Sequence, residues 1–217
     1  MENVRTRLLH GGGLVLAVAT SAVLLAVACL LSVGVLAPDD AEARSKATPV
    51  RGADSILGKP RYTEAQVTRY AKSKGATVYM IRAIPHYYDL APQVGIAPDV
   101  LVAQSMVETG YGRYGGDAKP WNMAGIKKGG NVGDEPRDFE RPKNAYQGVR
   151  MHVNHMAAYT NRKTVGKPHD RYYDAKSAQG SRGYWVRRVS QLGGGIWAVD
   201  PEYSGKIKRI LDEMSRA

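Results

Sequence analysis

The sequence feature that most constrains this chain is an uncharged run near its amino terminus. No residue from Gly11 to Pro38 carries a charge, and the stretch from Leu14 to Leu36 is almost entirely Leu, Val and Ala. About 20 apolar residues in a helix are enough to cross the hydrocarbon core of a bilayer. We therefore predict a signal anchor or signal peptide over residues 1–37, followed by about one domain of ordinary size.

The charges beside the run predict its orientation. Arg5 and Arg7 precede it, whereas Asp39, Asp40 and Glu42 follow it. Because the positively charged flank of such a segment stays in the cytoplasm, we expect the carboxyl-terminal part to be exported.

Two fates of the segment remain open from the sequence. Its length favours an uncleaved anchor that crosses the cell membrane once, but residues 41–43 read Ala-Glu-Ala, which is a cleavage pattern for a secreted protein. Residues 38–53 mix Asp, Ala, Ser, Arg and Gly and are expected to form a flexible linker. The folded domain is then expected over residues 54–217.

Several kinds of site are excluded by composition. The one cysteine, Cys29, lies in the apolar run, so the exported part has neither a disulfide nor a cysteine-based zinc site. His152 and His155 stand three residues apart without an HExxH motif or a suitably spaced carboxylate, and no phosphate-binding or dinucleotide-binding glycine motif is present. We predict no metal and no cofactor.

The exported part is strongly basic. Residues 44–217 contain 29 Lys and Arg but 16 Asp and Glu, which indicates an anionic partner. The basic residues are scattered rather than gathered in a recognition helix or arm, and export separates them from most nucleic acid. A nucleic-acid partner is therefore not predicted.

Capping and periodicity signals predict an all-α domain of six helices, with a small hairpin lobe as a possible addition. Thr63 and Gln66 form a capping box at the start of the first expected helix. The helices are expected from Thr63 to Gly75, Pro85 to Gly95, Pro98 to Gly110, Asn144 to Tyr159, Tyr184 to Leu192 and Asp200 to Met214. Residues 126–143 are polar and rich in Gly and Pro, so we expect a long loop or hairpin, which in compact domains is usually functional.

Glu108 is the leading candidate for a catalytic residue. It stands in the last turn of an apolar helix, where both the helix dipole and apolar neighbours disfavour its negative charge. A carboxyl with a raised pKa can protonate a leaving oxygen near neutral pH. Position alone leaves open an ordinary surface glutamate at a frayed helix end.

The surrounding motif resembles the core of the glucosaminidase domains of glycoside hydrolase family 73. There a helix ending AQ-x-x-x-E-[ST]-G-[WY]-G is followed by N-[NLFM]-x-G-I, and this chain has AQSMVETGYG and NMAGI within residues 97–127. Residues 56–70, 145–159 and 197–207 also resemble segments of bacterial wall hydrolases in the same order. The resemblance covers about residues 54–216.

The resemblance implies a lysozyme-like helical domain that hydrolyses the β-1,4 bond after N-acetylglucosamine in peptidoglycan, with Glu108 as general acid. Glycosidases commonly use a second carboxylate. The family has it in the lobe after the GI motif, where we favour Glu135, with Glu140 next, over Asp134 and Asp138. If no second carboxylate comes close, the acetamido oxygen of the substrate is the expected nucleophile.

Other matched positions imply a sugar site. Trp197 stands where the family often has Tyr, which leaves Tyr203 as the better candidate for a catalytic hydroxyl. Aromatic side chains with one apolar face and one polar tip suit a glycan groove. The predicted substrate-binding residues are Tyr111, Tyr114, Trp121, Asn122, Gly125 and Trp197, although Asn122 could instead cap the turn before Gly125.

Two other functions fit the same residues. A lytic transglycosylase also uses a lysozyme-like fold with one catalytic Glu and acts on the same glycan strands. A non-catalytic cell-wall-binding or assembly protein is the third hypothesis, and the presence of Glu108 argues against it.

Overall fold

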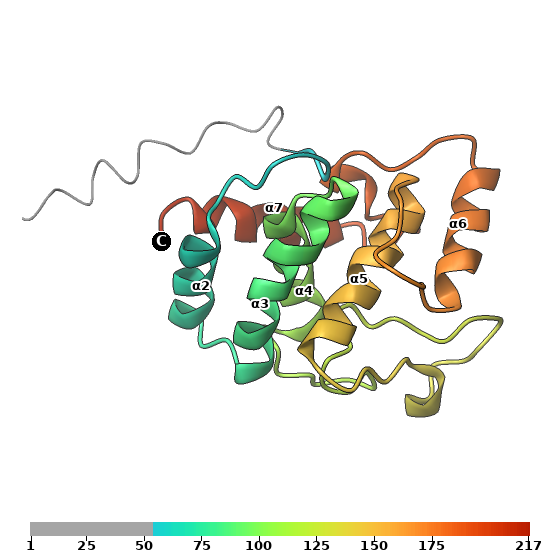
Figure 1. Cartoon of the computed structure of the whole chain (residues 1–217), viewed down its shortest axis with the longest axis horizontal. Coiled ribbons are helices and arrows are strands. Elements are labelled where there is room, and N and C mark those ends of the chain that lie inside the picture. Colours follow the sequence, from blue (N-terminus) through green and yellow to red (C-terminus); the bar gives the residue numbers. More distant parts are fainter. Residues whose placement is uncertain (1–53) are drawn as a thin grey trace, which may run out of the picture. The chain divides into compact units, whose positions relative to one another are not determined.

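A computed structural model describes residues 54–217 of the chain. Over these residues the backbone is helix and loop, with isolated β-bridges such as Lys127 to Phe139 in place of a sheet (Figure 1). The helix-rich architecture agrees with the predicted all-α class. The predicted leader and linker, residues 1–37 and 38–53, lie outside the described residues.

Six α-helices and three short 3₁₀ helices follow one another in the described range. The α-helices are α2 (Glu64–Ser73), α3 (Val78–Leu90), α4 (Pro98–Thr109), α5 (Ala145–Thr160), α6 (Arg171–Ser181) and α7 (Tyr203–Met214). The 3₁₀ helices are η1 (Ala91–Val94), η2 (Pro136–Asp138) and η3 (Val189–Gln191). Among residues 54–217, no helix is both long enough and apolar enough to span a bilayer.

Helix α4 lies at the centre of the core. Ten of its twelve residues are buried, and Val107 and Glu108 are the two that keep some exposure. Pro98 occupies the first turn, where its missing N–H costs nothing, and Gly110 ends the helix with a left-handed φ of 56°. Helices α3 and α7 pack against α4, while α3 also packs against α2 and α5. The carboxyl end of α4 is thereby enclosed by tertiary neighbours.

Three predicted helix starts are confirmed. Thr63 and Gln66 form the expected capping box on α2. Helix α4 begins at Pro98, and the Asn144 side chain accepts a hydrogen bond from the Gln147 N–H at the start of α5.

The predicted start of a helix at Pro85 is wrong. Helix α3 begins at Val78, and Pro85 is its eighth residue. The proline removes one backbone hydrogen bond to Ile81, but the buried side chains of Met80, Ala83 and Tyr87 hold the helix in the core. Tertiary packing here outweighs the local signal.

The helix predicted from Tyr184 to Leu192 is also wrong. Only η3 forms there, because the residues before it run extended, with Val186 N–H bonded to Tyr159 O and Arg188 bridged to Ser55. Helix α6 was not predicted from the sequence. It is polar, and only Tyr172, Ala175 and Gln179 are buried, so it shows no apolar stripe of the usual width.

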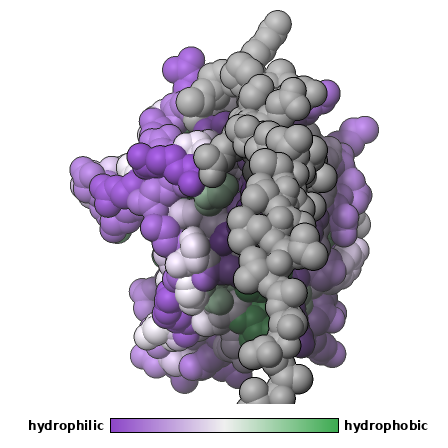
Figure 2. Space-filling model, turned by 90° about the vertical axis from the view of Figure 1, so that its left-hand side faces the viewer, coloured by the Kyte–Doolittle hydropathy of each residue, from purple (hydrophilic) through white to green (hydrophobic). Residues whose placement is uncertain are grey.

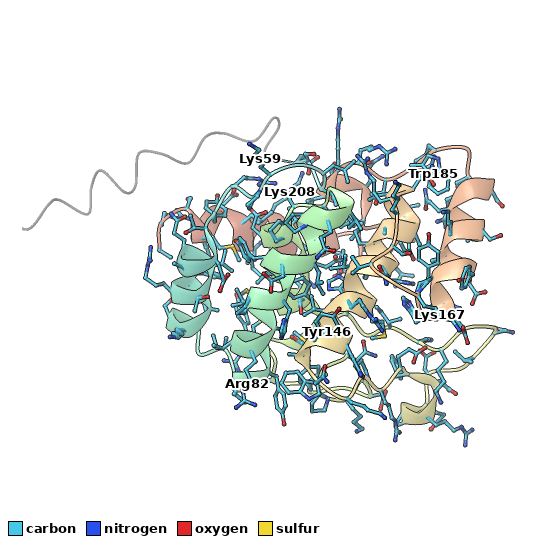
Figure 3. All side chains as sticks on the ribbon, viewed as in Figure 1. Lys59, Arg82, Tyr146, Lys167, Trp185 and Lys208 are labelled. Atoms are coloured by element: carbon cyan, nitrogen blue, oxygen red, sulfur yellow. The ribbon has the colours of Figure 1, made fainter. Side chains whose placement is uncertain are left out.

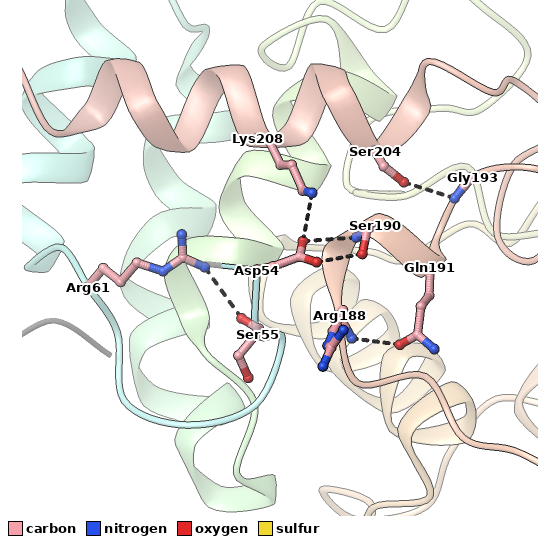
Figure 4. A network of polar contacts seen from close by, with 9 residues as sticks. All are labelled: Asp54, Ser55, Arg61, Arg188, Ser190, Gln191, Gly193, Ser204 and Lys208. Carbon is pink, nitrogen blue, oxygen red and sulfur yellow. Dashed lines mark hydrogen bonds and ion pairs between the residues drawn. The ribbon is translucent and has the colours of Figure 1, made fainter. Parts of the chain in front are cut away.

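The first described residues are fixed to the carboxyl-terminal part of the domain. Asp54 accepts hydrogen bonds from the backbone and the hydroxyl of Ser190 and pairs with Lys208 of α7 at 3.1 Å (Figure 4). Nearby, Gly193 N–H donates to Ser204 Oγ at 3.1 Å. These contacts hold η3 and the loop after it against α7.

Charged side chains are spread over the surface of the described domain. The face shown in Figure 2, on the side of α2 in Figure 1, is mostly hydrophilic where described residues are visible. In Figure 3, Lys59 and Lys208 are drawn near one another, whereas Arg82 and Lys167 lie at other places around the ribbon. Their spacing agrees with the scattered positive charge predicted from the sequence.

Candidate active site

Glu108 lies in the last turn of α4 and shares its carboxyl with two side chains from far along the sequence. Trp197 Nε1–H donates to Glu108 Oε1 at 2.8 Å, and the Tyr203 hydroxyl donates to the same oxygen. Tyr203 begins α7, which packs on α4, and Trp197 lies in the loop that leads to it. The fold thus brings three motif positions predicted from the sequence into direct contact.

Burial raises the pKa of the Glu108 carboxyl above its ordinary value. The hydrogen bonds from Tyr203 and Trp197 oppose this effect because they stabilise the ionised form, but burial is the larger cause. The direction agrees with the expectation from the sequence.

The second carboxyl oxygen of Glu108 has different surroundings. Among the described residues no protein group donates a hydrogen bond to Oε2. It faces Gly125, at which an added Cβ would lie 3.6 Å from Oε2, and the Gly125 φ of 58° also favours glycine. Oε2 is therefore the oxygen that a substrate group can approach.

A cavity of about 250 Å³ opens beside this carboxyl. Its walls come from α4, the loop after α4, α5, α6 and the loop before α7. The lining residues are Glu108, Ala124, Gly125, Ile126, Lys127, His155, Tyr159, Arg171, Trp197 and Ala198. Glu108 is the single carboxylate in this lining, and Lys127 and Arg171 add positive charge.

The comparison with protein families matches residues 84–216 to the family Glucosaminidase, described as mannosyl-glycoprotein endo-beta-N-acetylglucosaminidase. This match spans more than half of the chain. The chain belongs to the glucosaminidase family. It is accordingly a glycoside hydrolase that acts on a glycan. No curated protein and no solved structure matched the chain.

The indole of Trp197 is held in the glucosaminidase site by aromatic neighbours from α5. Its ring centroid lies 5.6 Å from that of His152, 5.1 Å from that of His155 and 5.0 Å from that of Tyr159. The contacts with His152 and Tyr159 are tilted and that with His155 is edge-on, and together they favour a defined ring orientation. They fix the direction of the indole N–H toward Glu108.

His155 and Tyr159 line the glucosaminidase pocket, although the sequence does not single them out as site residues. Their spacing of four residues indicates a shared helix face, which is a signal for burial rather than for a site. Trp197, which lies against both, is about 40 residues away in the sequence. No local pattern could have joined the three.

The histidines near the pocket have lowered pKa values, which favours their neutral form at pH 7. Burial lowers the pKa of His152 to about 3, that of His169 to about 4 and that of His155 well below its usual value. His155 Nδ1 and His169 Nε2 lie 3.1 Å apart, within hydrogen-bonding distance. In residues 54–217 no group of three or more histidine, aspartate or glutamate side chains is arranged to hold a metal ion.

Asn122 is fully buried and shapes the loop that carries Gly125. Its amide donates to Ile126 O and accepts from Ile126 N–H, both at 2.8 Å, and it also donates to Glu140 O. Of the two roles considered from the sequence, capping the turn before Gly125 is the one that these hydrogen bonds perform. Binding of an acetamido group by Asn122 stays a prediction.

The other three predicted aromatic residues lie outside the pocket lining. The Tyr111 and Tyr70 hydroxyls are 3.1 Å apart, the Tyr114 hydroxyl donates to Met123 Sδ, and Trp121 packs edge-on against Tyr79. Tyr111, Tyr114 and Trp121 all have positive φ, which is uncommon for aromatic residues. Their contribution to sugar binding stays a prediction.

The predicted second carboxylates are likewise outside the lining. Glu135 is exposed and forms a capping box with Asp138 on η2. Glu140 is partly buried, which raises its pKa, and it lines a separate cavity of about 340 Å³ with residues such as Arg150 and His169. A catalytic role for either glutamate stays a prediction.

Proposed function

We propose that this glucosaminidase is exported and hydrolyses the β-1,4 bond after N-acetylglucosamine in peptidoglycan, with Glu108 as general acid. The observation that carries the proposal is the unequal environment of the two Glu108 oxygens. Oε1 accepts two hydrogen bonds from the protein, whereas Oε2 faces the cavity beside Gly125. The basic surface suits an anionic wall polymer.

The hydrogen bonds determine which oxygen carries the acidic proton. Because Oε1 is the acceptor for two donors, a proton on the carboxyl belongs on Oε2. The raised pKa of Glu108 keeps that proton in place at higher pH than for an exposed glutamate. Oε2–H then donates to the glycosidic oxygen while the bond between that oxygen and the sugar C1 breaks.

The positive charge that develops at the sugar ring needs a partner, and the lining offers no second carboxylate. We propose that the acetamido oxygen of the substrate attacks C1 and forms a cyclic intermediate. Water then attacks C1, the bond between C1 and the acetamido oxygen breaks and reopens the ring, and the ionised Glu108 takes the proton of that water. Attack by Glu135 is the alternative, and it requires this exposed side chain to reach the pocket.

The test is a digest of purified peptidoglycan by the full-length chain in detergent, with mass analysis of the products. New reducing N-acetylglucosamine ends support the proposal. Anhydromuramic ends would instead identify a lytic transglycosylase, and the absence of cleavage would favour a wall-binding or assembly protein.

Glu108→Gln should lower kcat by about 100-fold or more, because general-acid catalysis commonly contributes that much. The matched control is Glu64→Gln, an exposed glutamate on α2 outside the site, which should retain full activity. Unchanged cleavage by Glu108→Gln would show that another group is the acid.

We propose the location of the enzyme from the predicted topology of its leader. An uncleaved leader would hold it in the cell membrane with the amino terminus in the cytoplasm, whereas cleavage would release it to the wall. The apparent mass and the amino-terminal sequence of the protein isolated from cells distinguish the two.

A further inference from the structure

A chain of hydrogen-bonded side chains leads from Glu108 into the core. Tyr203 donates to Glu108 Oε1, and Gln104 Nε2 donates to the Tyr203 hydroxyl at 3.0 Å. Gln104 Oε1 lies 3.0 Å from His152 Nε2, and His152 Nδ1 lies 2.7 Å from the Tyr87 hydroxyl. Gln104, His152 and Tyr87 are all fully buried.

One arrangement of donors and acceptors satisfies every group in this chain and also supplies the Tyr203 donor to Glu108. Because the Gln104 amide nitrogen donates to Tyr203, its oxygen faces His152 and needs a donor there. A neutral imidazole protonated on Nε2 supplies this donor and leaves Nδ1 free to accept from Tyr87. In all four hydrogen bonds the donor is then the group farther along the chain from Glu108, and the acceptor is the group nearer to it.

The opposite arrangement would satisfy the inner groups equally well. If the Gln104 amide turned over, its oxygen would accept the Tyr203 proton and its nitrogen would donate to His152 Nε2. His152 would then carry its proton on Nδ1 and donate to Tyr87. In that arrangement Glu108 loses the Tyr203 donor, so the tautomer of His152 decides whether Oε1 receives one hydrogen bond or two.

The surroundings of His152 keep it neutral, which makes a tautomer choice possible. Tyr87 from α3, Gln104 from α4 and the Trp197 ring from the loop before α7 contact the imidazole, and none of them carries a charge. Burial holds the pKa of His152 at about 3. A charged imidazole would donate from both nitrogens and would break its bond from Tyr87.

We propose that His152 is a positioning residue of the glucosaminidase. Its Nε2–H orients the Gln104 amide, which holds the Tyr203 hydroxyl as a donor to Glu108 Oε1 and so keeps the acidic proton on Oε2. The catalytic consequence rests on the proposed function of Glu108, whereas the direction of the hydrogen-bond chain does not.

The test compares His152→Leu with the parent full-length chain in detergent. The Tyr203 hydrogen bond lowers the Glu108 pKa, so losing it should raise that pKa. We expect the carboxyl carbon of Glu108, followed by NMR, to titrate at higher pH, and the alkaline limb of the kcat profile to move the same way. We expect kcat to fall about 10-fold while KM stays the same, because His152 does not line the pocket.

Two further variants separate positioning from a merely structural role. His152→Gln keeps an amide donor near Gln104 and should restore most of the parent profile. Tyr203→Phe should raise the Glu108 pKa by itself, and the double variant His152→Leu with Tyr203→Phe should raise it no further. Additive shifts, or an unmoved Glu108 pKa in His152→Leu, would overturn the proposal.

A measurement on the unmodified protein applies even if His152→Leu does not fold. The ¹⁵N shifts of His152 should show a neutral imidazole protonated on Nε2, and protonation on Nδ1 would overturn the proposal. The two proposals fail separately. If Glu108→Gln keeps full activity, Glu108 is not the general acid, but the predicted tautomer of His152 can still be correct. If Glu108→Gln is inactive and the Glu108 pKa does not move in His152→Leu, the general acid stands and only the positioning role of His152 is wrong.

Discussion

At the scale of single residues, the carboxyl of Glu108 has two unlike oxygens. Trp197 and Tyr203 both donate to Oε1, and Gly125 leaves space in front of Oε2. Burial raises the pKa of the group while the two donors hold its orientation. One side chain thereby combines a raised pKa with a fixed orientation, the two properties that the proposed general acid requires.

The residue-scale prediction concerns the nucleophile. Glu135→Gln should keep at least half of the parent kcat, because Glu135 is exposed on η2 and does not line the pocket. Steady-state hydrolysis of purified peptidoglycan measures the effect. The same assay on Glu140→Gln serves as the comparison, and a loss of 100-fold or more in either variant would identify a carboxylate nucleophile and contradict attack by the acetamido group.

The residues of the site differ in how far the sequence reveals them. Glu108 and Gly125 belong to one short motif, and Trp197 and Tyr203 to a second, so ordered motifs were enough to associate them. His155, Tyr159 and Arg171 line the same cavity only because α5 and α6 fold over it. Their role depends on tertiary contacts, which leave no trace in local spacing.

At the scale of elements, α5 approaches the loop after α4 at a glycine. A Cβ built on Gly148 would collide with the backbone carbonyl of Trp121, whose φ is 74°. The close approach therefore supports a backbone conformation that non-glycine residues rarely adopt. The loop that contains Gly125 continues directly from this contact.

Gly148→Ala should destabilise the fold by about 1–3 kcal/mol, the usual cost of overpacking, although alanine is the better helix former. Gly205→Ala in α7 is the matched control, since its added Cβ would meet only the Glu202 carboxylate at 3.6 Å. We expect the control to gain about 0.5–1 kcal/mol. Urea unfolding of both variants measures the difference, and equal effects would contradict the collision.

Local signals predicted the helices that carry strong caps and failed where packing decided. The capping box of Thr63 and the Asn144 cap mark α2 and α5 because side chains bond neighbouring backbone groups. Pro85 misled the prediction because buried neighbours keep α3 helical through it. The sequence does not predict the polar α6 because few of its residues face the core, so it lacks an apolar stripe.

At the scale of the whole molecule, three histidines with lowered pKa values lie in or beside the pocket of Glu108. His152, His155 and His169 all have pKa values lowered by burial, to about 3 for His152 and about 4 for His169. An unfolded histidine titrates near 6.5. The stability that depends on neutral histidine is therefore fully present above about pH 6.5 and is lost as the pH falls toward the folded values.

We expect the free energy of unfolding to fall between pH 7.5 and pH 5, with each of these histidines contributing at most about 1.4 kcal/mol per pH unit. Urea unfolding of the full-length chain at both pH values measures this. His152→Gln removes one titration and should make the decline shallower, whatever its effect at pH 7.5. An identical decline in the two proteins would show that His152 titrates normally in the folded state. The raised pKa of Glu108 has the opposite effect, because it makes the free energy of unfolding rise as the pH falls. This contribution is the same in the parent and in His152→Gln.

The unequal oxygens of Glu108 also bear on the design of inhibitors. Oε1 is saturated by Trp197 and Tyr203, so an added donor would compete with groups already in place. A sugar analogue that replaces the glycosidic oxygen with a basic nitrogen would instead meet Oε2 alone. Selectivity would then depend on how closely the analogue fits beside Gly125, where a single methyl group on the protein would obstruct it.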